Sequence, residues 1–514
     1  MLVKTYSAVV NGLDVTTVTI EVSTTPGSQF HLTGLGDEAV REGRNRVIAA
    51  MENNGYEFPI MDITINMAPA DIRKAGTGFD LPFALGLLQA TGNMSVNLEG
   101  YMFVGELSLD GSLLPVKGIL PISIQARKEQ FKGLIVPKAN AREAAVVNRL
   151  KVYGMDSMAQ VVRFLKGEEQ VEPTIVDTRK EFYEQQSDYP LDYSDVRGQE
   201  SVKRALEVAA AGGHNLIMVG PPGSGKSMMA KRLPSILPPL TLSESLETTQ
   251  IHSVAGILKQ GTSLITQRPF RAPHHTISEV ALVGGGVNPM PGEISMAHNG
   301  VLFCDELPEF NKHTLEVLRQ PLEDHQINIS RAKYSITYPC NFMFVASMNP
   351  CPCGYYGDPT HHCVCTPTQR QRYLNKISGP LLDRIDIQCE ISPVPFKDLS
   401  NLEPGEPSSA IRERVMRARA IQTERYKNVR GVHCNAQMTE RMIHQYAEPD
   451  EEGFERLRDA MERLSLSARA YSRILKVART IADLAASPTV RAEHIGEAIS
   501  YRKLDRADWA ELVL

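Results

Sequence analysis

The segment that most constrains the fold of this chain is residues 214–237, HNLIMVGPPGSGKSMMAKRLPSIL. The apolar run Leu216–Val219 predicts a buried strand, and GPPGSGKS (220–227) fits the phosphate-loop pattern G-x-x-x-x-G-K-[ST]. Glycines allow such a loop to wrap so that its N–H groups point at phosphate oxygens, and the helix expected from about Lys226 presents its positive end to the same anion. The order of strand, loop and helix predicts a parallel α/β domain that binds a nucleotide.

The motif GVLFCDELPEF (300–310) supplies the acidic residues that a phosphate loop requires. Its apolar strand, 301–303, leads to Asp305, which is expected to hold Mg²⁺ with Ser227 while Lys226 reaches the β- and γ-phosphates. Glu306 is expected to polarise the attacking water as a general base. An acidic pair after a strand can also be a simple loop start. The residues expected to contact nucleotide and magnesium are Gly220, Pro221, Pro222, Gly223, Ser224, Gly225, Lys226, Ser227 and Asp305.

Asn349 and Arg384 complete the predicted catalytic set. The strand in NFMFVASMNP ends at Asn349, and the carboxyl ends of parallel strands face the nucleotide. We therefore expect Asn349 to orient the water near the γ-phosphate. Arg384, in KISGPLLDRIDIQCEI, follows an expected helix and can stabilise transition-state charge on the nucleotide of a neighbouring subunit. The alternative for Arg384 is an ion pair with Asp383 or Asp386 of its own chain.

With 514 residues, the chain is too long for one hydrophobic core, and its pattern predicts a multidomain α/β protein. Residues 1–166 mix strand-like runs (15–22, 62–67, 134–136) with helix-like runs (38–53, 82–91, 121–129). The polar stretch 167–193 is predicted to be a linker, 194–393 a parallel-sheet ATPase domain, 394–409 a second linker and 410–514 a helical lid.

Four of the eight cysteines lie within residues 349–365, NPCPCGYYGDPTHHCVC. Two C-x-C pairs, separated by nine residues, are formed by Cys351, Cys353, Cys363 and Cys365. Four thiolates suit a closed, tetrahedral Zn²⁺ site, which would rigidify a long loop beside the nucleotide. His361 or His362 could replace one thiol. A loop of reduced thiols without metal is the alternative.

The overall composition excludes little but bears on location. A net charge of −5 gives no global sign of nucleic-acid binding, which depends on local patches. The N-terminus alternates like a strand, without the apolar core of a signal peptide, and no run of about 18 apolar residues predicts a membrane span. We therefore expect a cytoplasmic chain with no membrane partner. Thiols stay reduced there, so a metal site is favoured over disulfides.

Together these motifs resemble the AAA+ ATPases, and within them the magnesium-chelatase ATPase-subunit-like family and its ComM (YifB) competence-protein group. The resemblance covers essentially the whole chain. It is carried by GPPGSGKS, FRAPHHTISEVALVGGG (270–286), PGEISMAHNGVLFCDELPEF (291–310), SMNPCPCG (347–354), SGPLLDRID (378–386) and LSARAYSRILKVARTIADL (466–484). It implies an N-terminal Lon-protease-like α+β domain, a central AAA+ phosphate-loop domain with a parallel sheet, and a C-terminal helical lid.

The resemblance also implies roles for individual residues. Lys226 and Ser227 match Walker A, Asp305 and Glu306 match Walker B, Asn349 matches sensor 1, and Arg384 matches an arginine finger that acts in trans. A trans finger implies a ring of identical subunits, a hexamer. Arg469 matches the sensor 2 arginine, with Arg473, one turn later, as its rival.

Residues 326–338, QINISRAKYSITY, resemble the hairpin before sensor 1, which faces the central pore in helicases of this clade. Arg331 and Lys333, at or near its tip, are the predicted DNA contacts, and Tyr334 could stack on a base. The tail adds a stripe of arginines, for which a solvated helix face is the alternative: Arg412, Arg414, Arg417 and Arg419.

The N-terminal domain resembles the proteolytic domain of Lon protease through RKAGTGFDLPFALGLL (73–88) and GELSLDGSLLPVKGILPISIQA (105–126). Gly76 stands in place of the nucleophilic serine and Leu120 in place of the lysine. A Ser–Lys dyad needs both partners, so the domain is predicted to be a non-proteolytic scaffold or DNA-docking module. The alternative is a relocated dyad drawn from Ser108, Ser112 and Lys117.

The function implied by the resemblance is a hexameric motor that hydrolyses ATP with Mg²⁺. It would drive branch migration on branched or single-stranded DNA in homologous recombination and natural transformation. Two alternatives are a chelatase-type motor for a porphyrin-handling partner and a protein remodeller. His274 and His275, in RAPHHT, are predicted to pack or to contact a second subunit, because adjacent strand residues face opposite ways and do not share one ion.

Overall fold

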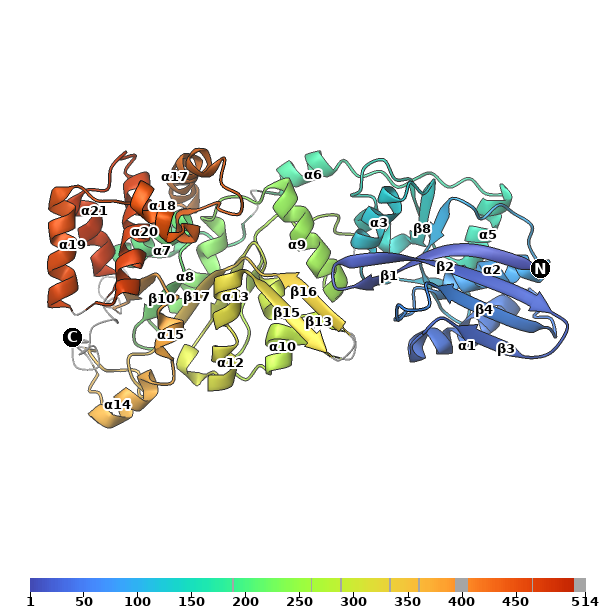
Figure 1. Cartoon of the computed structure of the whole chain (residues 1–514), viewed down its shortest axis with the longest axis horizontal. Coiled ribbons are helices and arrows are strands. Elements are labelled where there is room, and N and C mark those ends of the chain that lie inside the picture. The colour runs from blue at the N-terminus through green and yellow to red at the C-terminus, as the bar shows by residue number, and fades with distance from the viewer. Residues whose placement is uncertain are drawn as a thin grey trace.

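The computed structural model describes residues 1–186, 189–259, 261–286, 289–331, 334–358, 361–392, 405–464 and 466–502. The molecule is elongated, with an N-terminal sheet at one end and the C-terminal helices at the other (Figure 1). Helices α6 (Thr178–Gln185) and α9 (Leu242–Ala255) lie between them. This is the multidomain α/β architecture that the sequence predicts.

The N-terminal part is a seven-stranded sheet in the order β3-β4-β2-β1-β5-β8-β9. Its strands are β1 (Leu2–Asn11), β2 (Asp14–Thr25), β3 (Phe30–Thr33), β4 (Asp62–Ala68), β5 (Tyr101–Phe103), β8 (Gly133–Pro137) and β9 (Val152–Met155). β1 and β2 form an antiparallel hairpin whose two-residue turn holds Gly12 at φ +66°, a conformation that favours glycine. The three predicted strands in this part are confirmed.

Helices cover this sheet, and a short hairpin, β6 (Glu106–Leu107) with β7 (Leu113–Leu114), forms a separate two-stranded sheet. The helices are α1 (Glu38–Asn53), α2 (Asp80–Ala90), α3 (Ile119–Lys128), α4 (Ala141–Ala144) and α5 (Met158–Lys166). The Asp37 carboxylate accepts the N–H of Val40 and caps α1. α2 is buried along nearly its whole length, which accounts for its continuous apolar sequence. All three helices predicted here are confirmed.

The central part is a five-stranded sheet in the order β11-β14-β17-β10-β18, and every neighbouring pair is parallel. The strands are β10 (Leu216–Val219), β11 (Phe270–Arg271), β14 (Val301–Cys304), β17 (Met343–Met348) and β18 (Ile387–Glu390). β10, β14 and β17 are buried throughout, as expected for a parallel sheet with both faces covered. Helices α7 (Glu200–Gly212) and α8 (Lys226–Arg232) flank β10 in sequence.

An insert and a hairpin extend the central part toward the N-terminal sheet (Figure 1). The insert contains α10 (Glu279–Val283), β12 (Gly284–Gly285), β13 (Met290–Pro291) and α11 (Glu293–Met296). After α12 (Lys312–Glu316) and α13 (Arg319–Asp324), β15 (Gln326–Arg331) and β16 (Tyr334–Pro339) form the predicted antiparallel hairpin. The Tyr338 hydroxyl donates to Pro289 O at 3.0 Å, so the hairpin and the insert are packed together.

The C-terminal part is helical, as predicted. It comprises α17 (Ser408–Tyr426), α18 (Glu440–Tyr446), α19 (Glu451–Arg463), α20 (Ala468–Leu484) and α21 (Ala492–Ser500). Apolar residues of α17 and α20 share one core with α7, β10 and β17. This shared core places the lid beside the sheet.

The predicted linkers differ in what the structure contains. Residues 167–193 include α6, whose Phe182 is buried. Of the second segment, 394–409, the structure describes residues 405–409, which lead into α17. The exact domain boundaries therefore stay predictions. No helix within the described ranges is both long and apolar enough to cross a bilayer.

The contacts that join the N-terminal part to the central part include one at α9 and one at β16. α3 packs on α9, where the N–H of Gly118 donates to Ser253 O at 3.1 Å and the Ser253 hydroxyl donates to the buried Glu143 carboxylate. In addition, the β1–β2 turn lies against β16, because a methyl group on Gly12 would come within 2.4 Å of Ile336. The N-terminal sheet thus contacts the hairpin that is predicted to face the pore.

Candidate active site

The phosphate loop, residues 220–227, connects the carboxyl end of β10 to α8. Gly223 and Gly225 have φ values of +77° and +89°, which a residue with a side chain adopts only under strain. A Cβ on Gly220 would come within 2.4 Å of Ile391 O at the end of β18. The Ser224 hydroxyl donates to Pro221 O at 2.8 Å and closes the turn. These contacts explain the predicted glycine positions.

The Lys226 ammonium turns into this loop. It donates to Gly220 O at 2.7 Å, to Pro221 O at 2.8 Å and to Asn349 Oδ1 at 3.3 Å. Burial lowers the pKa of Lys226, and the charges of Asp305 and Glu306 oppose that shift. The predicted Walker A lysine and the predicted sensor 1 asparagine therefore meet at the carboxyl edge of the sheet.

Asp305 follows β14 and lies next to the loop. Its Oδ2 accepts the Ser227 hydroxyl at 2.6 Å, and its Oδ1 accepts the Ser347 hydroxyl from β17. A carboxylate and a hydroxyl are hard oxygen ligands of the kind that Mg²⁺ prefers, so these two residues fit the ion. Bound there, Mg²⁺ would neutralise charge on the β- and γ-phosphates. Ser347 was not predicted, because only the pairing of β14 with β17 brings it to Asp305.

Glu306 has a left-handed backbone, with φ +52°, which is uncommon for a residue with a long side chain. Its N–H donates to Asp305 Oδ1 at 3.2 Å and to Ser347 Oγ at 3.3 Å, and these bonds hold the strained conformation. Its side chain is 53% exposed, so water can reach the carboxylate. This geometry suits a general base beside the phosphates.

His275 contacts this carboxylate, with 3.8 Å between its Nδ1 and Glu306 Oε2. The rings of His274 and His275 lie side by side with centroids 4.1 Å apart and an interplanar angle of 34°. The expectation that the two side chains face opposite ways is wrong, because β11 ends at Arg271 and the histidines follow it in a loop. Sequence reasoning missed the contact with Glu306, which only the position of β11 beside β14 creates.

Arg384 and Arg469 lie at the opposite, amino edge of the sheet. Arg384 shortly precedes β18, which pairs in parallel with β10, and Asn215, directly before β10, donates to Arg384 O at 2.9 Å. β10 has four residues, so about 13 Å of strand separates this edge from the phosphate loop. Neither arginine is therefore positioned beside the phosphate loop of its own chain.

The three arginines at this edge have different partners. Arg384 pairs with Glu323, and not with Asp383 or Asp386, the two partners that the sequence suggested. Arg469 pairs with Asp383 at 2.5 Å and is 73% exposed, whereas Arg473 pairs with the buried Asp386 at 2.7 Å and is 26% exposed. Arg469 is thus the more accessible of the two sensor 2 candidates.

The four clustered cysteines converge, with all four Sγ atoms within 4.8 Å of one another. The Sγ separations are 3.3 Å between Cys351 and Cys353, 3.7 Å between Cys351 and Cys363, and 3.6 Å between Cys353 and Cys363. Tetrahedral Zn²⁺ with Zn–S bonds of about 2.3 Å requires Sγ separations of about 3.8 Å. The donor set therefore fits zinc, and the two histidines of the loop are not needed as ligands.

The cysteine loop also contacts the phosphate loop. Gly354, between the two thiol pairs, has φ +87°, and a Cβ there would come within 2.7 Å of Pro222 Cδ. At the other end of the loop, the Arg370 guanidinium donates to Cys365 O at 3.3 Å and stacks on Tyr356 at 4.0 Å from the ring centroid. The loop is thus held between α14 (Pro367–Leu374) and the nucleotide site.

The predicted DNA contacts, Arg331 and Lys333, belong to the tip of the β15–β16 hairpin. Arg331 ends β15 and pairs through its backbone with Tyr334, the first residue of β16. The side chain of Arg331 and the whole of Lys333 lie outside the described residues.

The residues of the alternative relocated dyad do not line one cavity together. Gly76 and Lys117 line a cavity of about 500 Å³ between this part and the insert, but Ser108 and Ser112 lie on the β6–β7 turn and are not among the residues that line it. Leu120, in the lysine position of Lon, is fully buried.

Comparison with known proteins agrees with this geometry. Three family models match: magnesium chelatase subunit ChlI at residues 192–399, subunit ChlI of Mg-chelatase at 20–140, and the ChlI C-terminal region at 405–502. YifB of Escherichia coli is 44% identical over 96% of both chains. Competence protein ComM of Haemophilus influenzae is 42% identical over 98% of this chain and 97% of its own.

A partial match covers the N-terminal region: Lon protease 2 of Bacillus subtilis is 29% identical over 28% of each chain. The phosphate loop, the acidic strand end and the helical lid lie in the regions that the chelatase models match. The chain therefore belongs to the magnesium-chelatase-like AAA+ ATPases, in the group that contains YifB and ComM.

Proposed function

We propose that this protein is a ring-forming ATPase, a hexamer, that moves branched or single-stranded DNA. The observation that carries the ring is the separation of the two halves of the active site. Lys226, Ser227 and Asp305 lie at the carboxyl edge of the sheet, and Arg384 and Arg469 lie at its amino edge. A complete site then requires the amino edge of one subunit to face the phosphate loop of the next.

In this proposal each residue keeps a single role. Lys226 and the loop N–H groups bind phosphates, Ser227 and Asp305 hold Mg²⁺, and Glu306 takes a proton from the attacking water. Asn349 orients that water. Arg384 of the adjacent subunit stabilises charge on the γ-phosphate, and Arg469 assists it because its side chain is exposed at the same edge.

DNA is proposed as the substrate because of the relative named competence protein ComM and the position of the β15–β16 hairpin. The hairpin contacts both the insert and the N-terminal turn at Gly12, so it can be supported from two sides. We propose that Arg331 and Lys333 contact DNA phosphates at its tip, and that the cytoplasmic protein acts in branch migration during natural transformation.

We also propose that the four clustered cysteines bind structural Zn²⁺. The Sγ separations support this, and the contact between Gly354 and Pro222 links the metal loop to the phosphate loop. Metal analysis of the purified chain should find one zinc per chain, and Cys363→Ser should lose it. The matched control, Cys434→Ser, removes a buried thiol outside the cluster and should retain the zinc.

A second candidate function is a chelatase-type motor, because the family models describe the chelatase ChlI subunit. A protein remodeller is a third outcome. We would measure ATP hydrolysis alone and with single-stranded DNA, four-way junctions or an unfolded protein, using Lys226→Ala as the blank. DNA should raise the rate several-fold, and labelled junctions should resolve only with ATP. DNA-blind hydrolysis with stationary junctions would exclude the DNA motor.

A further inference from the structure

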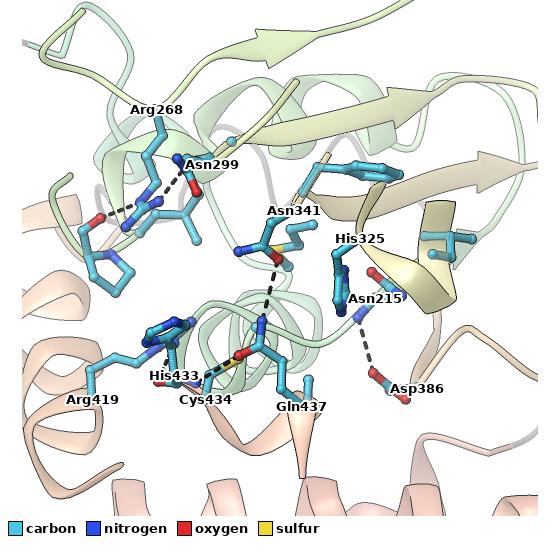
Figure 2. A pocket seen from close by; sticks show the side chains of 18 of the residues that line it. Asn215, Arg268, Asn299, His325, Asn341, Asp386, Arg419, His433, Cys434 and Gln437 are labelled. Carbon is cyan, nitrogen blue, oxygen red and sulfur yellow. Dashed lines mark hydrogen bonds between the residues drawn. The ribbon is translucent and has the colours of Figure 1, made fainter. Parts of the chain in front are cut away.

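A polar cavity of about 400 Å³ lies between the lid and the amino edge of the central sheet. Asn215 and Asp386, directly before β10 and β18, line its base (Figure 2). Arg268 and Asn299 form one wall, and Arg419 from α17 reaches it from the lid. The cavity is thus on the side of the sheet opposite the phosphate loop.

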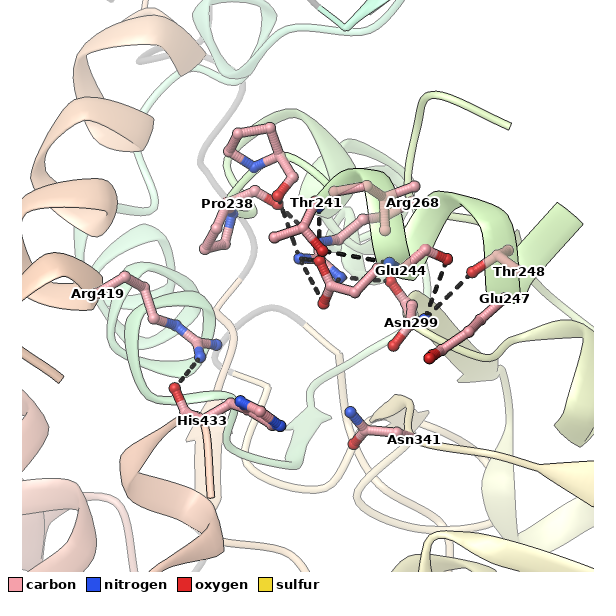
Figure 3. Close-up of polar contacts among 12 residues, drawn as sticks. Pro238, Thr241, Glu244, Glu247, Thr248, Arg268, Asn299, Asn341, Arg419 and His433 are labelled. Carbon is pink, nitrogen blue, oxygen red and sulfur yellow. Dashed lines mark hydrogen bonds and ion pairs between the residues drawn. The ribbon is translucent and has the colours of Figure 1, made fainter. Parts of the chain in front are cut away.

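The charges on the sheet side are compensated. Arg268 pairs with Glu244 at 3.3 Å and donates to Pro238 O and Asn299 O, as Figure 3 shows. Asp386 is held by Arg473 at 2.7 Å and by His214 at 3.3 Å. Glu323, the third carboxylate that lines the cavity, pairs with Arg384. These pairs are neutral, so the sheet side adds little net charge.

The lid side is different, because two of its cations have no carboxylate partner within the described part of the chain. Arg419 donates only to main-chain oxygens, His433 O at 3.4 Å and Ala210 O at 3.3 Å, and its Nε is buried without a hydrogen-bond partner. Lys476 from α20 donates to Ala436 O at 2.9 Å. Both cations line the cavity.

The electrostatic cost of this arrangement is visible at two groups. Burial lowers the pKa of Lys476 and the charge of Arg473 lowers it further, while the carboxylates of Asp386 and Glu440 oppose the shift without bonding the ammonium. Burial also lowers the pKa of Arg268, and Arg419 adds to that effect. Cations that face a cavity without a counter-ion are stabilised when an anion binds there.

We propose that this cavity binds a phosphate-bearing small molecule of nucleotide size, with its phosphate held by Arg419 and Lys476. Arginine and lysine are the usual phosphate-binding side chains, and the His433 imidazole lies next to Arg419 (Figure 3). A volume of about 400 Å³ exceeds what inorganic phosphate fills and lies in the range of small-molecule sites. The amides of Asn299 and Asn341 on the sheet side can hydrogen-bond an uncharged part of the ligand.

Such a ligand would connect the lid to the sheet, because Arg419 and Lys476 belong to lid helices and Asn299 belongs to the sheet side. Lys476 and Arg473 also line a second cavity with Arg384 and Arg469. Occupancy would therefore act on the edge that carries the arginines of the proposed ring contact. This site is separate from the ATPase site and goes beyond the proposed function.

The test uses full-length protein with Lys226→Ala, which disables the phosphate loop, titrated by calorimetry with ADP and separately with pyrophosphate. Adding Arg419→Gln should weaken ADP binding about tenfold, because a charge-assisted hydrogen bond is lost. Lys476→Met should do the same and provides a second variant if the first fails to fold. Arg417→Gln, on the exposed side of the same helix, is the matched control and should bind like the parent.

Each outcome decides a different point. Tighter binding of ADP than of pyrophosphate would support a ligand of nucleotide size, and equal binding would overturn that size. ADP and pyrophosphate affinities that stay at the parental value in both Arg419→Gln and Lys476→Met would overturn the proposal. A single-stranded oligonucleotide is titrated in the same way. If the two variants lose oligonucleotide binding but keep ADP binding, the proposal is also overturned, since the cavity would then serve DNA.

Discussion

The hydroxyl of Ser227 donates a 2.6 Å hydrogen bond to Asp305 Oδ2 and so joins the phosphate loop to the end of β14. Ser347 holds the other oxygen of the same carboxylate. The adjacent Glu306 is kept in its left-handed conformation by bonds from its N–H to Asp305 and Ser347. One carboxylate therefore positions both the proposed magnesium ligand Ser227 and the proposed general base Glu306.

Glu306→Gln should abolish most ATP hydrolysis while ATP binding persists. The amide keeps the size of the side chain but cannot accept a proton, and a positioned general base contributes about 10²–10⁴-fold to rate. Steady-state hydrolysis and nucleotide titration measure the two effects. Glu309→Gln, three residues later and paired with Lys376 at the surface, is the control and should hydrolyse ATP at the parental rate. Parental activity in Glu306→Gln would assign the base elsewhere.

Mixing two inactive variants should restore activity if Arg384 acts on a neighbouring subunit. Arg384→Ala alone should lose about 10³-fold or more of the rate, and Lys226→Ala should be inactive. In mixed rings, an intact phosphate loop meets an intact arginine at some interfaces. Lys226→Ala mixed with Glu306→Gln is the control, because every subunit then carries a defective site of its own. Equal activity in the two mixtures would contradict a trans role.

Gly354→Ala should weaken ATP binding without removing the metal. The substitution places a Cβ 2.7 Å from Pro222 Cδ in a backbone with φ +87°, so the phosphate loop must shift. We expect about a tenfold loss of ATP affinity with unchanged metal content. Gly167→Ala, at φ +76° with no atom within 4 Å, is the control for backbone strain alone. A loss of metal in Gly354→Ala would mean that the substitution disrupts the cysteine cluster itself.

Glu143→Gln should stabilise the contact between α3 and α9 at neutral and higher pH. Burial raises the pKa of Glu143 above its usual 4.5, although hydrogen bonds from Ser253 and Leu120 oppose this. The folded state therefore holds a proton that the unfolded state releases, and wild-type stability falls as pH rises from about 4.5 through the raised pKa. Glutamine keeps an acceptor for Ser253 and has no charge to bury.

The measurement for Glu143→Gln is the melting temperature as a function of pH. The difference between variant and wild type should become more positive as pH rises through that window. Glu168→Gln, at an exposed position in the same part of the chain, should show no such trend. A constant difference across the pH range would show that folding does not raise the pKa of Glu143.

Local sequence was sufficient where a feature depends on neighbours in the chain. The helix at 38–53 and the strand Leu216–Val219 are found where they were predicted, because hydrophobic periodicity and capping are local. The phosphate loop and the acidic residues after β14 are also found where they were predicted, because a few consecutive residues determine a turn or a strand end. The spacing of the four cysteines predicted a candidate metal site, and the structure brings their Sγ atoms together.

Tertiary structure decided what depends on the register of distant strands and on packing between parts. The pairing of Cys304 with Ala346 brings Ser347 to Asp305, and the loop after β11 brings His275 to Glu306, although nothing near these residues in sequence indicates either contact. Arg469 and Arg473 are one turn apart on one helix, and only their tertiary partners distinguish them: Asp383 pairs with Arg469, and the buried Asp386 pairs with Arg473. The polar cavity likewise depends on tertiary structure. Lid helices and the sheet edge are remote in sequence, and their packing places Arg419 and Lys476 at the same cavity.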